Sequence, residues 1–367
     1  MTYTARQLNR ATLDRQMLLR REPVDVLTAV DRVVAIQAQE PASPYLALWN
    51  RVEDFDPADL DEAFTSGAVR KASLMRITLH AVTAADHEVF HHAMLPALRA
   101  SRLYDKRFKG MDVTIEQTDA LLGHLLEFAR TPRQKAEIEE LLHSHVGDVG
   151  EPGVWWALRT YGGLVHAPTG GPWSFGLRPA YRSVTTRARE RLECVAAMLR
   201  RYLTGFGPAT VPDMNQFTML PRTTIREALA LLDLTESGGY YDVPHRTVPD
   251  EETPAPPRLM AMWDSTLLAY ADRTRLIPEP YRKVVIRTNG DTLPTLLVDG
   301  RVAGVWRPTE DGGIEATSFH ALSDDDWTGL AEEAATLKKL LGDREPQVYR
   351  RYARWWNGLP AHDVRVV

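Results

Sequence analysis

The sequence predicts an α+β fold of about three tandem winged-helix domains around a concave channel, with a C-terminal strand-rich region. Two observations lead to this prediction. Three helical patterns followed by strand patterns occur three times between residues 1 and 246, and strand patterns dominate after residue 258. No self-similarity appears at a fixed period, so the repetition is one of architecture. The length of 367 residues is sufficient for several domains.

The first winged-helix domain is predicted at residues 1–110. Apolar residues at helical spacing open the chain, and a second helix is expected from Pro23 to Pro41, because the residue before a proline disfavours helical backbone. A third apolar run covers residues 45–52. Residues 68–83 alternate between apolar and polar side chains, which is typical of strands.

The remaining boundaries follow from the same patterns. We expect a second winged-helix domain at 111–185, a third at 186–246, an acidic, proline-rich linker at 247–257 and a strand-rich domain at 258–367. The pair Asp299-Gly300 between apolar runs predicts a β-hairpin in the last domain. Further helices are expected at 114–129, at 133–144, after Pro152 and at 324–341.

Composition excludes several classes of protein. The polar N-terminus is unlike a signal peptide, and no apolar run is long enough for a membrane helix, so we expect a cytoplasmic protein. With Cys194 as the one cysteine, an intramolecular disulfide is excluded and a cysteine-based metal site is not expected. No phosphate-binding glycine loop or HExxH motif occurs. We therefore expect no cofactor, no metal and a monomer.

The net charge of −5 is distributed unevenly along the chain. Basic residues gather in 99–109, in 178–201 and in 273–287, whereas 310–333 contains eight acids and no Lys or Arg. Each cluster alone is equally well explained as a solvated helix face, but the three together favour an anionic partner. The candidate DNA-binding residues are Arg99, Arg102, Lys106, Arg107, Lys109, Arg182, Arg187 and Arg301.

Two glutamines, Gln37 and Gln39, form the most informative motif. Side chains two residues apart lie on one side of an extended chain, and Pro41 favours extended backbone here, so the two amides can converge on one point. An amide pair suits the positioning of a water or a base edge rather than strong acid–base chemistry. From the pattern alone, a helix-end pair bonded to backbone carbonyls is the stronger interpretation.

The motif Gln37-Ala38-Gln39 resembles that of the AlkZ family of bacterial winged-helix DNA glycosylases, although Ala38 stands where the family usually has a larger aliphatic residue. Four further segments resemble family signatures: Ser73–His80 with Arg76, Thr78 and His80; Tyr202–Thr210 followed by Asp213; Asp264, Leu267, Leu268, Asp272 and Arg273; and Leu297–Val302. Together they cover nearly the whole chain.

The resemblance implies a monofunctional glycosylase that acts on double-stranded DNA, removes N7-alkylpurines and unhooks azinomycin-type interstrand crosslinks, as antibiotic self-resistance enzymes do. It makes Gln37 and Gln39 the expected catalytic residues. An N7-alkylpurine is already cationic and leaves readily, so neutral amides that hold a water can suffice. The alternative is a non-catalytic winged-helix regulator or damage-binding protein, which the fold alone does not distinguish from an enzyme.

Other residues are open to two interpretations. Arg76, Thr78 and His80 alternate and so would share one face of a strand, as a DNA or glutamine contact or as a buried polar network. The Asp299-Gly300 hairpin would either enter a DNA groove or belong to the C-terminal sheet. Asp264 with Arg273 is a candidate structural ion pair, and the pairs Trp155-Trp156 and Trp355-Trp356 are expected in the core.

Overall fold

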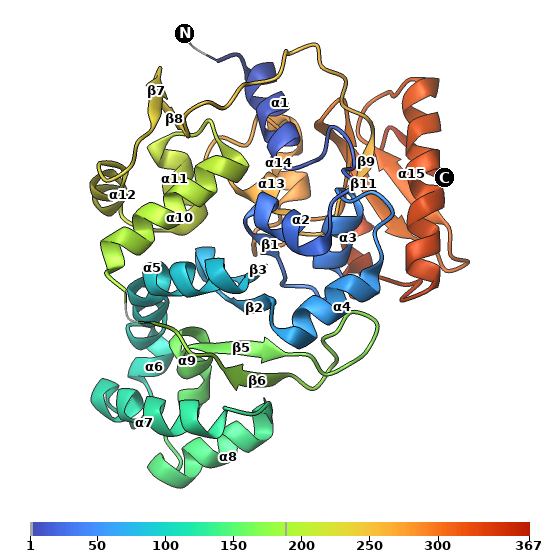
Figure 1. Cartoon of the computed structure of the whole chain (residues 1–367). Helices are drawn as coiled ribbons and strands as arrows, with labels where there is room; N and C mark the ends of the chain where they lie inside the picture. The colour runs from blue at the N-terminus through green and yellow to red at the C-terminus, as the bar shows by residue number, and fades with distance from the viewer. Residues whose placement is uncertain (1–2, 188) are drawn as a thin grey trace.

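The computed structural model describes residues 3–187 and 189–367 (Figure 1). Its helices are α1 (Ala5–Arg15), α2 (Val26–Val33), α3 (Ser43–Trp49), α4 (Pro57–Ser66), α5 (Ala84–Leu103), α6 (Lys106–Lys109), α7 (Ile115–Phe128), α8 (Lys135–Val146), α9 (Val154–Tyr161), α10 (Arg191–Phe206), α11 (Val211–Thr218), α12 (Arg222–Leu229), α13 (Ser265–Leu268), α14 (Arg282–Val285) and α15 (Asp324–Gly342). Short 3-10 helices are η1 (Met75–Ile77), η2 (Glu279–Tyr281) and η3 (Arg350–Trp356).

The strands form three antiparallel sheets. They are β1 (Ile36–Gln37), β2 (Val69–Ser73), β3 (Leu79–Thr83), β4 (Arg133–Gln134), β5 (Leu164–Ala167), β6 (Ala180–Ser183), β7 (Thr235–Ser237), β8 (Tyr240–Asp242), β9 (Arg258–Leu259), β10 (Thr295–Val298), β11 (Arg301–Pro308), β12 (Ile314–Ser318) and β13 (Asp363–Val366). The sheet orders are β1-β3-β2-β5-β6-β4, β13-β12-β11-β10-β9 and β7-β8.

The six-stranded sheet joins the first two helix–strand units. Each unit contributes helices and then a hairpin, β2-β3 in the first and β5-β6 in the second. The two hairpins meet where Lys71 of β2 pairs with His166 of β5. In Figure 1 the second unit, α7 to β6, lies below the first, and α5 lies across the junction between them. One continuous sheet therefore contains strands from both units, with the junction between β2 and β5 at its centre.

The C-terminal sheet shares a core with the first helices. Tyr45 and Leu46 of α3 are buried in the same apolar cluster as Val305 and Trp306 of β11. The Asn50 side chain donates a hydrogen bond of 2.8 Å to the Leu259 carbonyl of β9. The helix α15 covers this sheet on the outer side, at the right of Figure 1. The N-terminal and C-terminal segments thus form one packed body.

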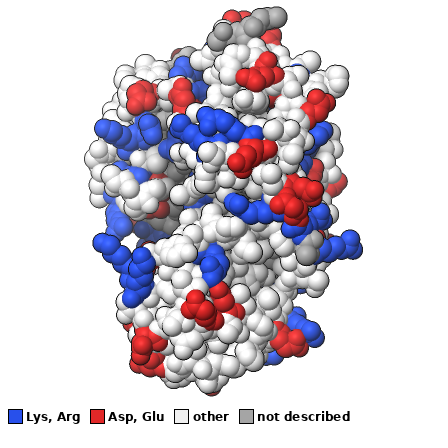
Figure 2. Space-filling view, turned by 90° about the vertical axis from the view of Figure 1, so that its left-hand side faces the viewer, with Lys and Arg blue, Asp and Glu red and all other residues white. Residues whose placement is uncertain are grey.

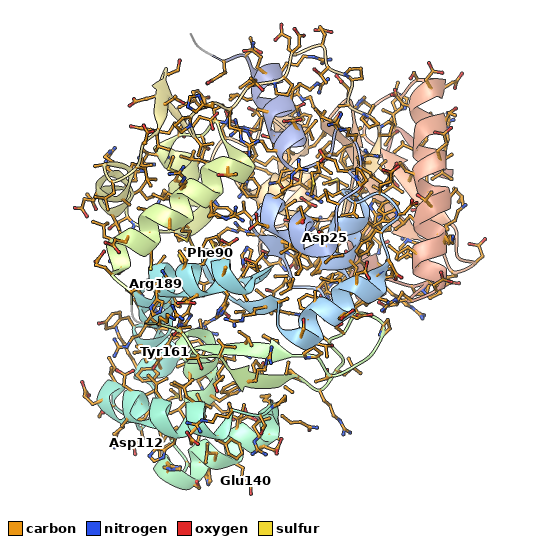
Figure 3. All side chains as sticks on the ribbon, viewed as in Figure 1. Asp25, Phe90, Asp112, Glu140, Tyr161 and Arg189 are labelled. Carbon is orange, nitrogen blue, oxygen red and sulfur yellow. The ribbon has the colours of Figure 1, made fainter. Side chains whose placement is uncertain are left out.

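The core of the upper left part of the molecule forms around α5 and α10. Phe90 of α5, labelled in Figure 3, is fully buried, as are Tyr202 and Phe206 of α10. Gly205 allows α10 to pack closely on the segment after α2, because a Cβ there would lie 2.7 Å from Val34 Cγ2. This contact places the third helix–strand unit, α10 to β8, directly against the segment that leads to Gln37.

The predicted element order is confirmed for most of the chain, with two corrections. The second helix does not reach Pro41: it ends at Val33, where Val34 adopts a φ of 70°, and the chain becomes extended at Ile36. The strand pattern of 68–83 is interrupted by η1, in which Arg76 has a φ of 53°. Arg76 therefore does not share a strand face with Thr78 and His80.

Among the described residues no helix is both long and apolar enough to cross a membrane.

Candidate active site

The glutamine motif lies at one edge of the six-stranded sheet. Gln37 is opposite His80 in the β1–β3 pairing, and the Ala38 amide donates to the Leu79 carbonyl at 2.8 Å. The Gln37 side chain is 3% exposed, whereas that of Gln39, just beyond the strand, is exposed to solvent. The motif thus presents one glutamine to the interior and one to solvent.

A polar network holds Gln37. Arg76 Nη2 lies 3.2 Å from both Gln37 Oε1 and His80 Nε2. The Thr78 hydroxyl lies 3.4 Å from the same glutamine oxygen, and His80 Nδ1 lies 3.0 Å from the Thr78 carbonyl. The two interpretations of Arg76, Thr78 and His80 therefore coincide. The residues form a polar network in which His80 is buried and the other two are half-buried, and that network contacts the glutamine.

The electrostatics of the network fix the protonation state of His80. Burial, followed by the adjacent charge of Arg76, holds the pKa of His80 well below its usual value. A neutral ring can donate through Nδ1 to the Thr78 carbonyl and accept at Nε2 from Arg76. Burial, and then the charge of Arg273, lower the pKa of Arg76 to about 10, so Arg76 stays charged at neutral pH. Arg76 is thereby a charged donor aimed at Gln37 Oε1.

Gln39 lines a pocket of about 160 Å³ between the first two units. Its Oε1 accepts a long hydrogen bond of 3.5 Å from the Leu79 amide, and its Nε2 has no hydrogen-bond partner within the described chain. The pocket is also lined by Ser73, Ile77, Thr78, Leu79, Arg102, Arg159, Thr160, His166 and Tyr181. The Gln39 amide is thus largely free to bind a ligand or a water.

The nearest carboxylate along the chain does not face this pocket. Glu40 is 8% exposed, accepts a hydrogen bond of 2.6 Å from the Tyr352 hydroxyl and forms an ion pair with Arg351. No Asp or Glu occurs among the described residues that line the pocket. The described groups around Gln39 are therefore neutral or cationic.

The candidate DNA-binding residues differ in whether their side chains already have hydrogen-bond or ion-pair partners within the protein. Arg99 bonds to Asp119, and Arg107 donates to Asp105 at 3.0 Å through two nitrogens. Arg102 donates to Thr160 Oγ1 at 2.9 Å and lies next to Gln39 in the pocket. The side chains of Lys106, Lys109 and Arg187 have no ion-pair or hydrogen-bond partner among the described residues, and Arg301 contacts only the Thr274 carbonyl, at 3.2 Å.

Arg182 packs against Gly67, where a Cβ would lie 2.1 Å from Nη2.

On the face in Figure 2, Lys and Arg side chains surround a hollow on the left, whereas acids lie mainly at the top, bottom and right. Arg189 of the second cluster, labelled in Figure 3, is paired with Glu88 at 3.1 Å. The basic clusters therefore contain both unpaired cations and arginines that form ion pairs within the protein.

Three structural expectations are settled. The Asp299-Gly300 hairpin belongs to the C-terminal sheet, and its turn is bound by Arg6 and Arg10 of α1. The expected pair of Asp264 with Arg273 is wrong: Asp264 pairs with Arg51 at 2.9 and 3.0 Å. The predicted burial of Trp155, Trp156, Trp355 and Trp356 is confirmed.

Arg159 and its neighbours in the second unit were not predicted as site residues. They reach the pocket because the Lys71–His166 pairing aligns the two hairpins, and sequence spacing does not reveal such a contact. One signal was present: Arg159 is the only charged residue of α9, VWWALRTY, and is exposed on an otherwise buried helix. A lone cation on a helix that is otherwise apolar therefore marks the one position of α9 that faces solvent.

Comparisons with known proteins agree with this architecture. The chain is 24% identical over 370 residues to an interstrand DNA cross-link repair glycosylase of Streptomyces sahachiroi, covering 93% of this chain and 98% of that protein. The solved structure of the Streptomyces sahachiroi DNA glycosylase AlkZ is similar, with a TM-score of 0.77, 20% identity and coverage of 94% and 98%. The family model described as DNA glycosylase AlkZ-like matches residues 30–340, and the chain therefore belongs to the AlkZ-like DNA glycosylase family.

Proposed function

We propose that this glycosylase hydrolyses the N-glycosidic bond of N7-alkylpurines in duplex DNA, including purines in interstrand crosslinks. The supporting observation is the pocket beside Gln39, whose described lining contains amide, hydroxyl and guanidinium groups but no carboxylate. A neutral base requires acid catalysis to leave, whereas an N7-alkylated purine is already cationic. The lining thus offers no carboxyl group as a general acid, and a labile base that is already cationic does not need one.

In this proposal Gln39 positions the attacking water, and Gln37 orients the loop that carries Gln39. The exposed Gln39 amide has an unused donor and a weakly used acceptor, so it can hold a water at the sugar C1′. Gln37 is held by the half-buried Arg76 through a hydrogen bond of 3.2 Å. Correct orientation of the water, rather than its activation by a strong base, supplies the rate enhancement.

A crosslinked purine adds a constraint on the site. A base tethered to the opposite strand cannot rotate freely into a deep pocket, as an ordinary flipped base does. The Gln39 pocket is lined by residues of both the first and the second unit, and Gln39 itself is exposed to solvent, which suits a lesion that stays in or near the duplex. The resemblance to a cross-link repair glycosylase supports the same substrate class.

The test is release of 7-methylguanine from duplex DNA, detected as strand breaks after alkali. We expect Gln39→Ala to lose most of this activity and to keep its affinity for the duplex, because one neutral side chain contributes little to DNA binding. Gln117→Ala, which changes an exposed glutamine of α7, is the matched control and should retain activity.

Two outcomes would contradict the proposal. Binding without base release by the unaltered protein would favour a damage-binding protein instead. Efficient release of uracil, a neutral base, would overturn the inferred restriction to cationic lesions. Equal losses of activity and affinity in Gln39→Ala would mean that the glutamine is structural.

A further inference from the structure

Two arginines in the Gln39 pocket have no anionic partner. Arg102 of α5 and Arg159 of α9 both line the pocket. Arg159 is exposed and forms no hydrogen bond or ion pair within residues 3–187 and 189–367. Arg102 Nε donates to Thr160, and within the same residues its two terminal nitrogens have no partner. Five guanidinium nitrogens are thus unused at this site.

The protein holds Arg102 in place without neutralising it. Its guanidinium lies 4.7 Å from the centre of the Trp156 ring, and Thr160, which receives its hydrogen bond, is buried. Arg107 contacts the same ring at 4.5 Å, but its guanidinium is paired with Asp105 and is therefore already neutralised, unlike that of Arg102. Arg102 is therefore a fixed donor whose free edge faces the pocket.

The surroundings of Arg102 disfavour its charge. Burial, followed by the charges of Arg159 and Arg107, lowers the pKa of Arg102. The neighbouring His166 also has its pKa held well below its usual value, by burial and by the charges of Lys71 and Arg159. Asp105 offsets this effect only in part, and no carboxylate is hydrogen-bonded to Arg102 among the described residues. A half-buried guanidinium next to a second cation is costly, and an incoming anion relieves that cost.

We propose that Arg102 and Arg159 together bind a backbone phosphate adjacent to the target nucleotide and so position its sugar against Gln39. This inference rests on the proposed function. The planar fork of arginine matches phosphate oxygens and makes short, charge-assisted hydrogen bonds. The bound phosphate also neutralises the two cations, which otherwise oppose the oxocarbenium charge that develops at C1′. The two arginines are positioning residues.

The experiment couples each arginine to single phosphates of the DNA. Duplexes carrying one 7-methylguanine are made with a neutral methylphosphonate at each of the flanking positions in turn. Single-turnover excision and duplex affinity are measured for the unaltered protein, Arg159→Gln, Arg159→Lys and Arg102→Gln. The control is Arg20→Gln, because the Arg20 side chain is 82% exposed and lies outside the pocket.

We expect one methylphosphonate position to slow excision by the unaltered protein about tenfold or more, the effect of losing a charge-assisted hydrogen bond. The same substitution should add no further loss in Arg159→Gln or Arg102→Gln, whereas Arg20→Gln should behave as the unaltered protein does. Arg159→Lys should restore part of the rate, because it keeps the charge and loses the fork. The salt dependence of binding should fall by about one unit in each Gln variant.

Equal slowing of the unaltered protein and of both Gln variants at every position would overturn the proposal, since the arginines would then contact no phosphate. If the unaltered protein released no 7-methylguanine, the proposed function would fail. The affinity measurements would still decide the phosphate site, because coupling between an arginine and a methylphosphonate is visible in binding alone. Unchanged thermal midpoints in the variants show that their folds are intact.

Discussion

Acid destabilisation of the helix that carries Arg102 follows from two buried histidines. His87 is 0% exposed and His91 8% exposed, and their rings on α5 are stacked with centroids 5.8 Å apart. Burial, followed by the charges of His91, Arg70 and His92, lowers the pKa of His87 to about 3. Burial, followed by the charge of His92, lowers the pKa of His91 to about 4.

The direction of the effect follows from proton uptake. In the unfolded chain each histidine gains a proton as the pH falls through about 6.5, whereas in the folded chain both rings stay neutral until much lower pH. Their contribution to stability is therefore complete above pH 6.5 and is lost as the pH falls below it. Between pH 7 and pH 5 the loss is about 2 kcal/mol for each ring. A loss of this size is a large part of a typical stability of roughly 5–15 kcal/mol.

Urea unfolding at pH 7 and pH 5 measures this loss. We expect His87→Leu to lose about 2 kcal/mol less than the unaltered protein between the two pH values, whatever its stability at pH 7. The control is His143→Leu, an exposed histidine of α8, which should leave the pH dependence unchanged. If His87→Leu and the unaltered protein lost the same free energy, the buried rings would not be the cause.

Three further perturbations test other parts of the structure. Arg51→Met should destabilise the protein by about 3–5 kcal/mol because it leaves Asp264 buried and unpaired, and adding Asp264→Leu should recover much of that loss in urea unfolding. Arg76→Met should lower 7-methylguanine excision about tenfold with little change in duplex affinity, because Gln37 loses its charged donor; equal loss of both would contradict this. Gly300→Ala should lower the thermal midpoint, since the φ of Gly300 is 73° and a Cβ there would lie 2.4 Å from Leu13 Cδ1. An unchanged midpoint would contradict this, because it would mean that α1 shifts to accommodate the Cβ without loss of stability.

Local signals made much of the fold predictable. The Asp299-Gly300 pair does form the β10–β11 turn, with φ values of 46° and 73°. The helix predicted at 324–341 is α15, and Ser323 caps it as its spacing to Asp326 allows. Such features depend on residues a few positions apart, and their physical causes are visible in the sequence.

Features that depend on distant contacts were not predictable. Arg51 lies 213 positions from Asp264, so sequence proximity favoured the wrong partner, Arg273. The alternation of apolar and polar residues over 68–83 predicted continuous strands and gave no sign of η1. The positive φ of Arg76 is unfavourable for arginine itself, so it depends on contacts with other elements, which the local sequence does not reveal. Arg159 of α9 lines the same pocket as Gln39 because the first two units pack together, a contact between segments far apart in the sequence.

Backbone strain lies around the glutamine motif. Arg76 and Ile77 adopt φ values of 53° and 59°, and Val34, three residues before Gln37, adopts 70°. These conformations are unfavourable for non-glycine residues and most of all for β-branched ones, so packing from elsewhere must impose them. Gly205 of α10 lies against Val34, and Arg76 lies 5.5 Å from the ring centre of Phe217 of α11. Both constraints come from the third unit, which otherwise lies outside the Gln39 pocket. The third unit therefore packs against the turns at Val34 and Arg76, which adjoin the proposed catalytic glutamine motif.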